Sequence, residues 1–437
     1  MMADPVLTTS LLFGFMLLFL MLGVPIAIAL GGISIGMIYF FWSPMALNMV
    51  PIRAFSTASS FEYVAIPLFI FMAAMLQRAS IAEDLYNTMQ KFFGGLRGGL
   101  AVGTIVICTL FAAMAGISGA ATISMGMIAI PAMLARGYGK DIALGSIAAG
   151  GSLGILIPPS VTMIVYGIVA NTSIGKLYAG GLLPGLLISA LFIAYLLIRG
   201  WLQPEISGGR EMTRYSLREK LVSLKGLVLP VLLIVGVMGS ILTGIASVSE
   251  ASAIGAAGSI LAAAVLGRLD WSVLRQACEE TLQLSCMIFW IIIGATALST
   301  FYTAMGASRL IEGLVLDLEV NRWLILVGML SILFIMGMML DTVGIIMITA
   351  PIFVPIITAL GFDPVWFGIL FIIMMEIGFL TPPFGYNLFY LRGVAPPEVR
   401  MTDIYRSVVP FIALMLVAVA ICMVFPQIIL VLPNAMF

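Results

Sequence analysis

The sequence predicts an all-α polytopic membrane protein with two interrupted membrane spans, and three observations lead to this fold class. Of 437 residues, 62% are hydrophobic and only 9% are charged, whereas soluble domains carry roughly 25% charged residues. Apolar runs long enough to cross a bilayer recur along the whole chain. Two of these runs are broken by the same signature, in Gly154 to Ser160 and in Gly378 to Phe384.

Each signature contains a Pro-Pro pair, Pro158-Pro159 or Pro382-Pro383, which cannot continue an α-helix. Backbone groups freed in hydrocarbon are costly, so such a break persists only where protein or a cavity covers it. A pair of Gly/Pro-interrupted spans in corresponding halves of a chain points to the binding site of a secondary transporter. We therefore expect the functional site at the two breaks.

The apolar runs between charged clusters give about ten full spans at roughly 20 residues each. They are expected near residues 7–23, 25–42, 63–77, 141–170, 179–199, 227–246, 250–267, 283–303, 364–392 and 408–431. Two further pairs of apolar runs, 98–117 with 119–135 and 323–339 with 342–360, are predicted to be helical hairpins. In each pair a polar or glycine-containing tip separates the two arms, and charges lie only at the outer ends.

Basic residues set the orientation, because cytoplasmic loops carry an excess of Lys and Arg. With the N-terminus outside, 16 of the 20 Lys and Arg residues fall in the cytoplasm, including Arg210 and Arg214, and four fall outside: Arg53, Lys176, Arg309 and Arg322. This count requires both hairpins to be re-entrant, the first entering from the cytoplasm and the second from the far side. Both termini are then predicted to be periplasmic.

The elements fall into two halves in the same order. Each half holds five full spans and one hairpin, and this odd number of crossings predicts an inverted repeat. The first repeat is expected over 1–198, with its hairpin at 98–135 and its broken span at 141–170. The second repeat is expected over 226–437, with its hairpin at 323–360 and its broken span at 364–392. A cytoplasmic linker, 199–225, is expected to join the two repeats. Two amphipathic stretches, 80–95 and 269–282, are expected in the cytoplasmic interface, either as arms that link a moving part to a fixed one or as plain connecting helices.

Composition also argues against other functions. A net charge of zero gives no indication of a nucleic-acid surface. The chain has no histidine, the commonest proton shuttle and metal ligand, so we expect no cofactor and no transition metal. Intramembrane aspartyl proteolysis needs two facing aspartates, and only Asp341 lies deep in apolar sequence. A passive channel does not explain two hairpin tips opposed to two broken spans, so we expect a carrier and not an enzyme.

The hairpin tips and the breaks contain the candidate ligand groups. The first tip runs from Ala115 to Thr122 and the second from Met336 to Thr342. Free carbonyls and helix C-termini suit a hard cation such as Na⁺, whereas helix N-termini attract a carboxylate. Ser118 and Thr122 are candidate ligands of the ion or the substrate. Alternatively, they cap the helix that forms the second arm of this first hairpin.

Four polar residues near the breaks are candidate ligand contacts, because they lie within about two helical turns of the Pro-Pro pairs: Ser160, Tyr166, Thr381 and Asn387. Gly154 and Gly378 are expected to matter for the backbone conformation and not for side-chain chemistry, because only glycine lets another segment approach the main chain very closely.

Three carboxylates lie in apolar sequence. Asp341 is a functional candidate because an ionisable group at membrane depth is costly, although it could equally cap the helix that begins at Thr342. Glu376 precedes the second break by five residues and is interpreted either as a structural acid or as a coupling acid. Glu250, in Ser247-Val-Ser-Glu250, is expected to cap the helix that follows it.

Taken together, these residues resemble the large membrane subunit of TRAP (tripartite ATP-independent periplasmic) transporters over nearly the whole chain. Six motifs in chain order carry the resemblance: Phe92 to Gly99, Gly116 to Thr122, Gly151 to Ser160, the Glu250-Ala-Ser turn, Leu340 to Gly344, and Glu376 to Gly385. Any one of these motifs is weak evidence for the resemblance, but six motifs in the same chain order are specific for the family.

The resemblance implies an elevator transporter in the bacterial inner membrane. It implies Na⁺-driven uptake of organic acids together with a small four-helix membrane subunit and a soluble periplasmic substrate-binding protein. Carried onto this chain, the first ion site involves Gly116, Ser118, Gly154, Ile157 and Pro159, largely through carbonyls. The second involves Met338, Asp341, Thr342, Gly378 and Thr381. Substrate contacts fall to Thr122, Ser160, Tyr166 and Asn387, and Glu376 is the candidate coupling acid.

One departure from the family pattern concerns the first tip. Family members often have two serines after the first tip glycine, whereas this chain has Ala120 and Ala121. This difference weakens the case for side-chain ligation at the first site. The alternative to a TRAP subunit is a stand-alone Na⁺/dicarboxylate symporter of related inverted-repeat fold, which works without a binding protein.

Overall fold

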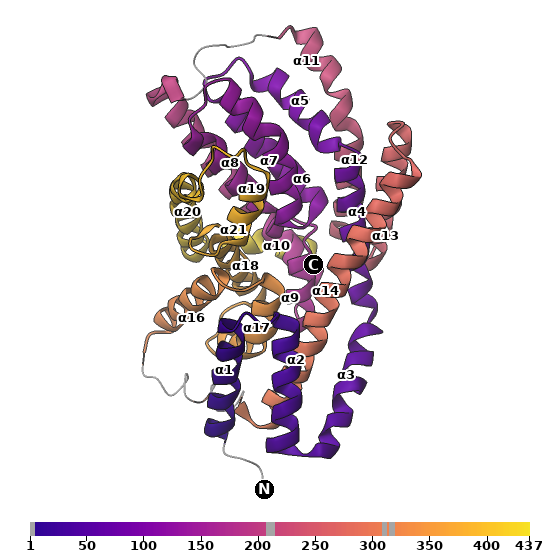
Figure 1. Cartoon of the computed structure of the whole chain (residues 1–437), viewed down its shortest axis with the longest axis vertical. Coiled ribbons are helices and arrows are strands. Elements are labelled where there is room, and N and C mark those ends of the chain that lie inside the picture. The colour runs from indigo at the N-terminus through magenta and orange to yellow at the C-terminus, as the bar shows by residue number, and fades with distance from the viewer. Residues whose placement is uncertain (1–4, 207–214, 308–312, 314–319) are drawn as a thin grey trace.

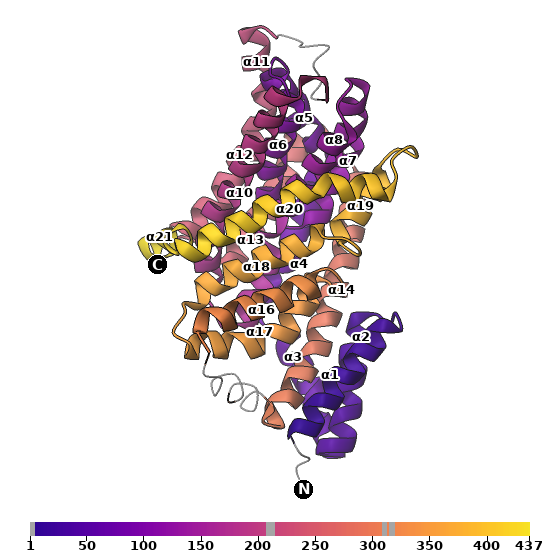
Figure 2. The same cartoon turned by 90° about the vertical axis from the view of Figure 1, so that its left-hand side faces the viewer.

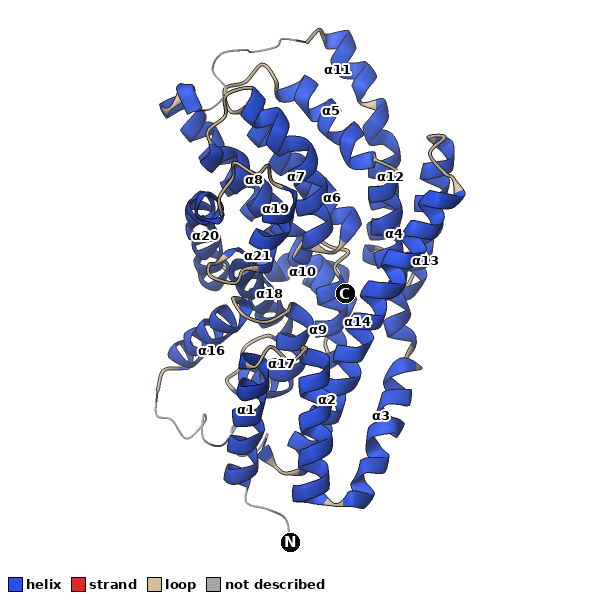
Figure 3. Ribbon diagram, viewed as in Figure 1, coloured by secondary structure: helices blue, strands red, loops and turns tan. Residues whose placement is uncertain are grey.

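The computed structural model describes residues 5–206, 215–307, 313 and 320–437, and every regular element in these ranges is a helix (Figures 1 and 3). Eight of the helices are long and apolar enough to cross a membrane. The prediction of an all-α polytopic membrane protein is therefore confirmed. The predictions for Arg210, Arg214 and Arg309 lie outside the described residues.

The helices before the linker follow the predicted runs closely. They are α1 (Pro5–Met21), α2 (Ile26–Met37) with a π-helical end (Ile38–Trp42), α3 (Met49–Ala58), α4 (Ala65–Arg78) with a 3₁₀ turn before it (Phe61–Val64), α5 (Ile81–Phe93), α6 (Gly99–Ala115), α7 (Ser118–Ala135), α8 (Lys140–Ser152), α9 (Val161–Val169) and α10 (Ile174–Leu202). The short helix α3 was not predicted, because its 10 residues are too few for a span.

The helices after the linker begin with α11 and continue the same pattern. They are α11 (Leu217–Ser223), α12 (Lys225–Leu242), α13 (Val248–Val265), α14 (Trp271–Ala304), α16 (Arg322–Gly337), α17 (Thr342–Ala359), α18 (Pro364–Leu380), α19 (Tyr386–Val394), α20 (Met401–Val424) and α21 (Gln427–Met436). Both predicted breaks are present, between α8 and α9 and between α18 and α19. Both Pro-Pro peptide bonds within them are cis.

Two expectations about helix boundaries were wrong. The amphipathic stretch 269–282 and the span 283–303 form one continuous helix, α14, which Asp270 caps by accepting a hydrogen bond from the Val273 amide at 2.8 Å. No proline interrupts α14, so the change from amphipathic to apolar sequence does not end the helix. The span expected over 408–431 ends at Val424, because Pro426 prevents the helix from continuing into α21.

Most of the helices form two groups (Figure 1). We call α1–α4 with α12–α14 the scaffold bundle, in which α2 and α4 pack along α14 and α13 packs on α4. We call α6–α10 with α16–α21 the core bundle, in which α7 packs on α8, α20 on α8 and α16 on α18. In Figure 2 the helices α16, α17, α18 and α20 cross the long axis of the molecule in stacked layers, and α5 lies beside α6.

Small residues hold the scaffold bundle together, and an ion pair ties it to α5. A Cβ added to Gly294 of α14 would lie 2.8 Å from the Ala27 carbonyl oxygen, so α2 and α14 approach at backbone distance. At one end of the bundle the Arg268 guanidinium donates to both carboxylate oxygens of Asp84, at 2.6 and 3.0 Å. Hydrogen bonding to Asp84 raises the pKa of Arg268, and the bidentate pair ties the loop between α13 and α14 to α5.

The predicted role of Glu250 as a helix cap is confirmed. Its carboxylate accepts from the Ser247 amide at 2.7 Å, and the Ser247 hydroxyl accepts from the Glu250 amide at 3.3 Å. The two residues form a capping box at the start of α13.

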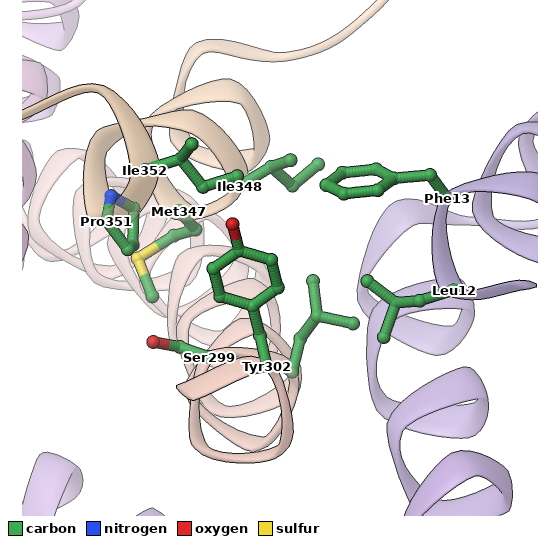
Figure 4. A pocket seen from close by; sticks show the side chains of 9 residues that line it. Leu12, Phe13, Ser299, Tyr302, Met347, Ile348, Pro351 and Ile352 are labelled. Carbon is green, nitrogen blue, oxygen red and sulfur yellow. The ribbon is translucent and has the colours of Figure 1, made fainter. Parts of the chain in front are cut away.

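The two bundles meet at several places, among them α4 with α6 and α9. At another, between α1, α14 and α17, nine residues line a small pocket (Figure 4). Leu12 and Phe13 reach it from α1, while Met347 and Ile348 reach it from α17. The Tyr302 ring of α14 packs edge-on against Phe13, with 6.4 Å between the ring centroids. The contact between the bundles at this place is therefore almost entirely apolar.

Candidate functional site

The first hairpin tip rests directly on the first break. We call this contact the first junction, formed by residues 115–118 and 151–160. Gly116 ends α6 with φ +63°, and a Cβ on it would lie 2.6 Å from the Pro159 carbonyl oxygen. The Gly116 carbonyl accepts a hydrogen bond from the Val161 amide at 3.3 Å. A Cβ on Gly154 would lie 3.0 Å from the Ile117 carbonyl oxygen, so main chain faces main chain across this junction.

The second hairpin tip rests on the second break in a similar way. We call this contact the second junction, formed by residues 337–342 and 378–385. A Cβ on Gly378 would lie 2.6 Å from the Gly337 Cα, so no side chain fits between α16 and α18 there. The Thr381 amide donates to the Gly378 carbonyl at 3.0 Å, and its hydroxyl donates to the Ile377 carbonyl at 2.7 Å. The Tyr405 hydroxyl of α20 donates to the Pro383 carbonyl at 2.8 Å.

Asp341 is the N-cap of α17, with its carboxylate accepting from the Val343 amide at 3.0 Å. This is the capping role that the sequence left open, and the Asp341 side chain is only half-buried. Met338 ends α16 next to it and is also half-buried, while Thr342 is buried as the first residue of α17. The Asp341 carboxylate therefore lies at the second junction, on a residue that is partly exposed.

Two of the proposed substrate residues bond to each other instead of pointing into an open site. The Thr122 hydroxyl on α7 donates to the Asn387 Oδ1 on α19 at 2.6 Å, and the Asn387 Nδ2 donates to the Ala148 carbonyl on α8 at 2.6 Å. Both side chains are fully buried. Their bonds join α7, α8 and α19, so their direct role in this structure is to hold those three helices together.

Ser160 and Tyr166 are also buried, at the start and in the middle of α9. The Ser160 hydroxyl bridges the first break: it donates to the Ile155 carbonyl at 2.5 Å and accepts from the Met163 amide at 3.3 Å. Tyr166 packs against Phe371 of α18, with ring centroids 5.2 Å apart. Neither side chain is presented to an open space at a hairpin tip.

Ser118 begins α7 and is buried at the first junction. The N-cap position of α7 is Ile117, which makes no side-chain cap, so the alternative role of Ser118 and Thr122 as caps of this arm is not found. Ile157 directs its side chain toward Gly185 of α10, since a Cβ on that glycine would lie 2.6 Å from the Ile157 Cγ1. Ile157 thus contributes main chain and not side chain to the first junction.

Glu376 lies on α18 and is completely buried. Its Oε1 lies 2.9 Å from the Ser152 Oγ, at the last residue of α8 before the first break. The Ser152 hydroxyl also lies 2.8 Å from the Ala149 carbonyl. Because Glu376 is close to the second break in sequence, this contact connects the two broken spans.

Three residues of this site were not predicted. Ser152 lies within one of the six motifs and Gly337 within the second hairpin tip, but nothing in their local sequence shows that Ser152 faces Glu376 or that Gly337 faces Gly378. Gly151 was also missed; a Cβ on it would lie 3.0 Å from the Thr122 Cα, so it lets α7 approach α8. Close helix packing requires a small residue on each of the two facing helices. A single sequence shows the small residues but does not show which of them face each other.

The two junctions gather groups that suit a cation and an anion. The C-terminal end of α6 and the carbonyls of the first break lie at the first junction, and the C-terminal ends of α16 and α18 lie at the second. Such ends carry partial negative charge, whereas the starts of α7, α9, α17 and α19 carry partial positive charge. Broken helices arranged in this way form the binding sites of secondary transporters.

Solved membrane transporters share this architecture. The structure is similar to that of the Alcanivorax borkumensis YdaH transporter, with a TM-score of 0.66 and 14% identity over 97% of this chain and 99% of that one. It is also similar to Neisseria gonorrhoeae MtrF, with a TM-score of 0.58, 14% identity, and coverage of 97% and 95%. At this level of identity the likeness shows the fold alone.

Sequence comparison identifies the family. The profile of the tripartite ATP-independent periplasmic transporter DctM component matches residues 13–428. The chain is 35% identical to the C4-dicarboxylate TRAP transporter large permease protein DctM of Pseudomonas aeruginosa, over 92% of this chain and 93% of that protein. The chain therefore belongs to the family of TRAP transporter large permease proteins, as the sequence motifs predicted, and it is a multi-pass membrane protein.

Other relatives carry different names. The ectoine TRAP transporter large permease protein TeaC of Halomonas elongata is 31% identical over 98% of this chain and 100% of that protein. The isethionate TRAP transporter permease protein DctMQ of Oleidesulfovibrio alaskensis is 34% identical over 98% of this chain, which spans 66% of that protein's length.

Proposed function

We propose that this chain is the transport subunit of a Na⁺-coupled, binding-protein-dependent secondary transporter that imports a small organic acid. The observation that carries the proposal is the contact of each glycine-marked hairpin tip with the break of its neighbouring span. Gly116 faces Pro159 at the first junction, and Gly337 faces Gly378 at the second. Main-chain oxygens gathered between helix ends are the ligands that a hard cation requires.

At the first site the ion ligands come from main-chain oxygens of Gly116, Ser118, Gly154, Ile157 and Pro159, together with the Ser118 hydroxyl. At the second site Asp341 and Thr381 supply side-chain oxygens beside the main chain of Met338, Thr342 and Gly378. The half-exposure of Asp341 and Thr381 supports this assignment, because an ion must reach its ligands.

The substrate is bound between the two tips, where the starts of α9 and α19 attract a carboxylate. Thr122, Ser160, Tyr166 and Asn387 shape this region. Because Thr122 and Asn387 bond to each other, we assign them to fixing the position of α19 and not to direct substrate contact.

The driving force is sufficient for accumulation. Each Na⁺ that enters down about 100 mV releases roughly 2.3 kcal/mol, and a tenfold gradient adds about 1.4 kcal/mol. Two Na⁺ ions with one monoanion leave on the order of 5 kcal/mol, whereas one ion leaves only about 1.4 kcal/mol. Two sites, one in each half, therefore match the energetic need.

We propose that the core bundle moves against the scaffold bundle as an elevator. The two halves, 1–198 and 226–437, form an inverted repeat about the linker 199–225, and both hairpins are re-entrant. The contact of α1 and α14 with α17 supports sliding, because most of the residues that line it are apolar. The protein lies in the bacterial inner membrane with both termini periplasmic.

The partners in this proposal are a small four-helix membrane subunit and a periplasmic substrate-binding protein. The name of the DctMQ relative and its greater length support a fused arrangement of the two membrane parts in that protein. For the present chain, a separate small subunit corresponds to the second membrane part of that relative. Substrate choice resides largely in the soluble partner.

The test is uptake into proteoliposomes that contain the chain and its small subunit. A C4-dicarboxylate, ectoine and isethionate serve as labelled probes, chosen from the names of the relatives. We expect uptake of one probe only with external Na⁺ and added binding protein. Equal uptake without the binding protein contradicts the proposal and indicates the stand-alone symporter, and uptake driven by a pH gradient alone contradicts Na⁺ coupling.

A further inference from the structure

Three side chains that can donate hydrogen bonds gather beside α5, a helix that belongs to neither bundle. α5 packs along α6 and against α7 (Figures 1 and 2), and it is not among the helices long and apolar enough to cross a membrane. Tyr86 lies on α5, Arg136 is the C-cap of α7, and Tyr138 follows two residues later. Tyr86 and Tyr138 are buried, with 3% and 7% of their surface exposed, whereas Arg136 is half-buried.

The three side chains are close enough to influence one another. Burial raises the pKa of Tyr86 to about 12, while the Arg136 charge acts against this rise and Tyr138 adds to it. Burial also raises the pKa of Tyr138, with the Leu100 amide and Arg136 acting in the opposite direction. One guanidinium group therefore lies near both hydroxyl groups, and no carboxylate of the described residues is among the groups that act on either tyrosine.

These donors lack acceptors within the described part of the chain. The Tyr86 hydroxyl is buried and has no hydrogen-bond partner there. The Tyr138 hydroxyl accepts from the Leu100 amide at 3.2 Å, which leaves its own hydrogen free to donate. Arg136 donates through Nη1 to the Ala132 carbonyl at 3.4 Å and forms no ion pair with a described residue. Because a buried donor without a partner is costly, the cluster fits an acceptor that comes from outside the chain.

An anion with several oxygen atoms can accept from all three donors at once. Arginine is well suited to phosphate, because its planar set of N–H groups matches two phosphate oxygens. The start of α6, whose Leu100 amide bonds to Tyr138, adds partial positive charge. The two carboxylates of α5 lie elsewhere, since Asp84 bonds to Arg268 and Glu83 also acts on Arg268. The chemistry of the cluster therefore favours a phosphate group.

The surface beside Arg136 favours a lipid as the source of this phosphate. Met127 of α7 is 54% exposed, and Pro131 and Ala135 are exposed as well. These three residues recur at every fourth position, so they form one apolar stripe along α7 that ends beside Arg136. In the proposed orientation this end lies at the cytoplasmic surface, where basic pockets between membrane helices bind anionic lipid headgroups. A phospholipid can thus place its acyl chains on the stripe and its phosphate at Arg136.

We propose that Arg136, Tyr86 and Tyr138 form a binding site for a phosphate group, which an anionic phospholipid supplies. The guanidinium and the two hydroxyls donate to the phosphate oxygens, and the bound headgroup holds α5 against α6 and α7. None of the three residues belongs to either junction, so this inference does not depend on the proposed Na⁺ coupling.

The test uses the purified full-length chain after its native lipids have been removed in excess detergent. The unfolding temperature is measured in mixed micelles that contain an increasing mole fraction of dioleoyl phosphatidylglycerol. Dioleoyl phosphatidylcholine and inorganic phosphate, the latter at constant ionic strength, are added in parallel series. We expect a saturable rise of the unfolding temperature with phosphatidylglycerol and much smaller changes with the other two additions.

Arg136→Gln and Tyr86→Phe remove donors while they keep most of the side-chain volume. Each should raise the half-saturating mole fraction of phosphatidylglycerol about tenfold, because each loses a hydrogen bond to a charged group. Without lipid, Tyr86→Phe should unfold at the temperature of the wild type or higher, because it removes a buried donor that has no partner. A hydroxyl with a purely structural role would instead lower the unfolding temperature of the lipid-free protein when it is removed.

Arg275→Gln and Tyr195→Phe are the matched controls. Arg275 pairs with Glu279 of its own helix at 2.8 Å, and the Arg199 guanidinium carbon lies 6.0 Å from the centre of the Tyr195 ring. Both controls should keep the half-saturating mole fraction within about twofold of the wild type, because surface ion pairs contribute little.

An unchanged half-saturating mole fraction in Tyr86→Phe together with Arg136→Gln overturns the proposal, and Tyr86→Phe alone decides if the arginine variant does not fold. Equal effects of the two lipids also overturn it, because acyl chains alone would then account for binding. An equal loss in Arg275→Gln means a non-specific effect of charge and contradicts the site. A rise with inorganic phosphate that Arg136→Gln abolishes, without any effect of phosphatidylglycerol, overturns the lipid as the source and identifies free phosphate as the ligand.

Discussion

The two junctions have similar components, but they differ in how deeply they are buried. Every residue of the first break, 151–160, is buried, whereas at the second break Thr381 and Pro382 are half-buried and Phe384 is 52% exposed. Each break carries a Pro-Pro pair and faces a hairpin tip at backbone distance. The difference in burial therefore does not come from the motif.

The helix that packs against each break, α10 or α20, explains the difference in burial. Against the first break, α10 presents Gly181 and Gly185, and a Cβ on Gly181 would lie 2.8 Å from the Leu156 carbonyl oxygen. The Tyr178 hydroxyl of α10 also donates to the Ser160 carbonyl at 3.3 Å. The corresponding helix after the second break, α20, contains no glycine and reaches the break through Tyr405. Two similar motifs thus give one closed and one open junction, because their neighbours differ in size.

The largest expected effect concerns the charge at the open junction. Asp341→Asn should lower Na⁺-dependent uptake about 100-fold, because a charged ligand is lost. Asparagine caps a helix about as well as aspartate, so the unfolding temperature should stay close to that of the wild type. Uptake into proteoliposomes and thermal unfolding measure the two effects separately.

Asp363→Asn is the control for this experiment, since Asp363 caps α18 by accepting from the Val365 and Trp366 amides. It should leave uptake nearly unchanged. Wild-type uptake from Asp341→Asn shows that Asp341 acts only as a cap.

The second prediction concerns the backbone contact at the closed junction. Gly116→Ala adds a Cβ that lies 2.6 Å from the Pro159 carbonyl oxygen, at a residue with φ +63°. We expect the free energy of unfolding to fall by about 2 kcal/mol or more, from overpacking together with backbone strain. Unfolding in mixed micelles measures this loss.

Gly393→Ala provides the comparison, because no atom lies within 4 Å of a Cβ added at that helical position. Its effect should lie within about 0.5 kcal/mol. A similar loss in both variants means that the tip contact is not specific.

The third prediction compares a threonine at each junction. Thr122→Val removes the donor to Asn387 Oδ1 and leaves a buried acceptor unpaired, which should cost about 1–3 kcal/mol of folding free energy. Thr381→Val acts at the open junction and should change stability by less than about 0.5 kcal/mol while it raises the Na⁺ concentration needed for half-maximal uptake. Equal stability losses in the two variants contradict the distinction between closed and open junctions.

The smallest effect concerns reactivity only. Phe384→Cys should react readily with a soluble maleimide, whereas Ile157→Cys, at a position that is 2% exposed, should react slowly. Both variants are made in a background without the four native cysteines, and uptake is checked for each. Rapid labelling of Ile157→Cys shows that the first junction opens in solution.

Much of this architecture was predictable from local sequence. The breaks at Pro158-Pro159 and Pro382-Pro383 follow from the missing amide and the fixed φ of proline. The limits of α6, α7, α16 and α17 follow from apolar runs between glycine or polar tips, and the family followed from motifs in order. These features depend on neighbours along the chain, which a sequence displays directly.

The partners of buried polar groups were not predictable in the same way. The sequence placed Thr122 and Asn387 among the substrate residues because both are polar, Thr122 at the first hairpin tip and Asn387 close to the second break. The structure brings them together over a separation of 265 residues, and they satisfy each other. The continuity of α14 was missed for a related reason, since a change of polarity along a helix resembles a boundary between two elements.

The amino-acid sequence by itself determined that the chain lies in a membrane, where its helices break and which residues are too small to keep neighbouring helices apart, because apolar length, proline and glycine act locally. Only the tertiary structure decided which break is closed, which helices Asn387 joins and that Glu376 meets Ser152, because burial and hydrogen bonding depend on residues that are distant in sequence.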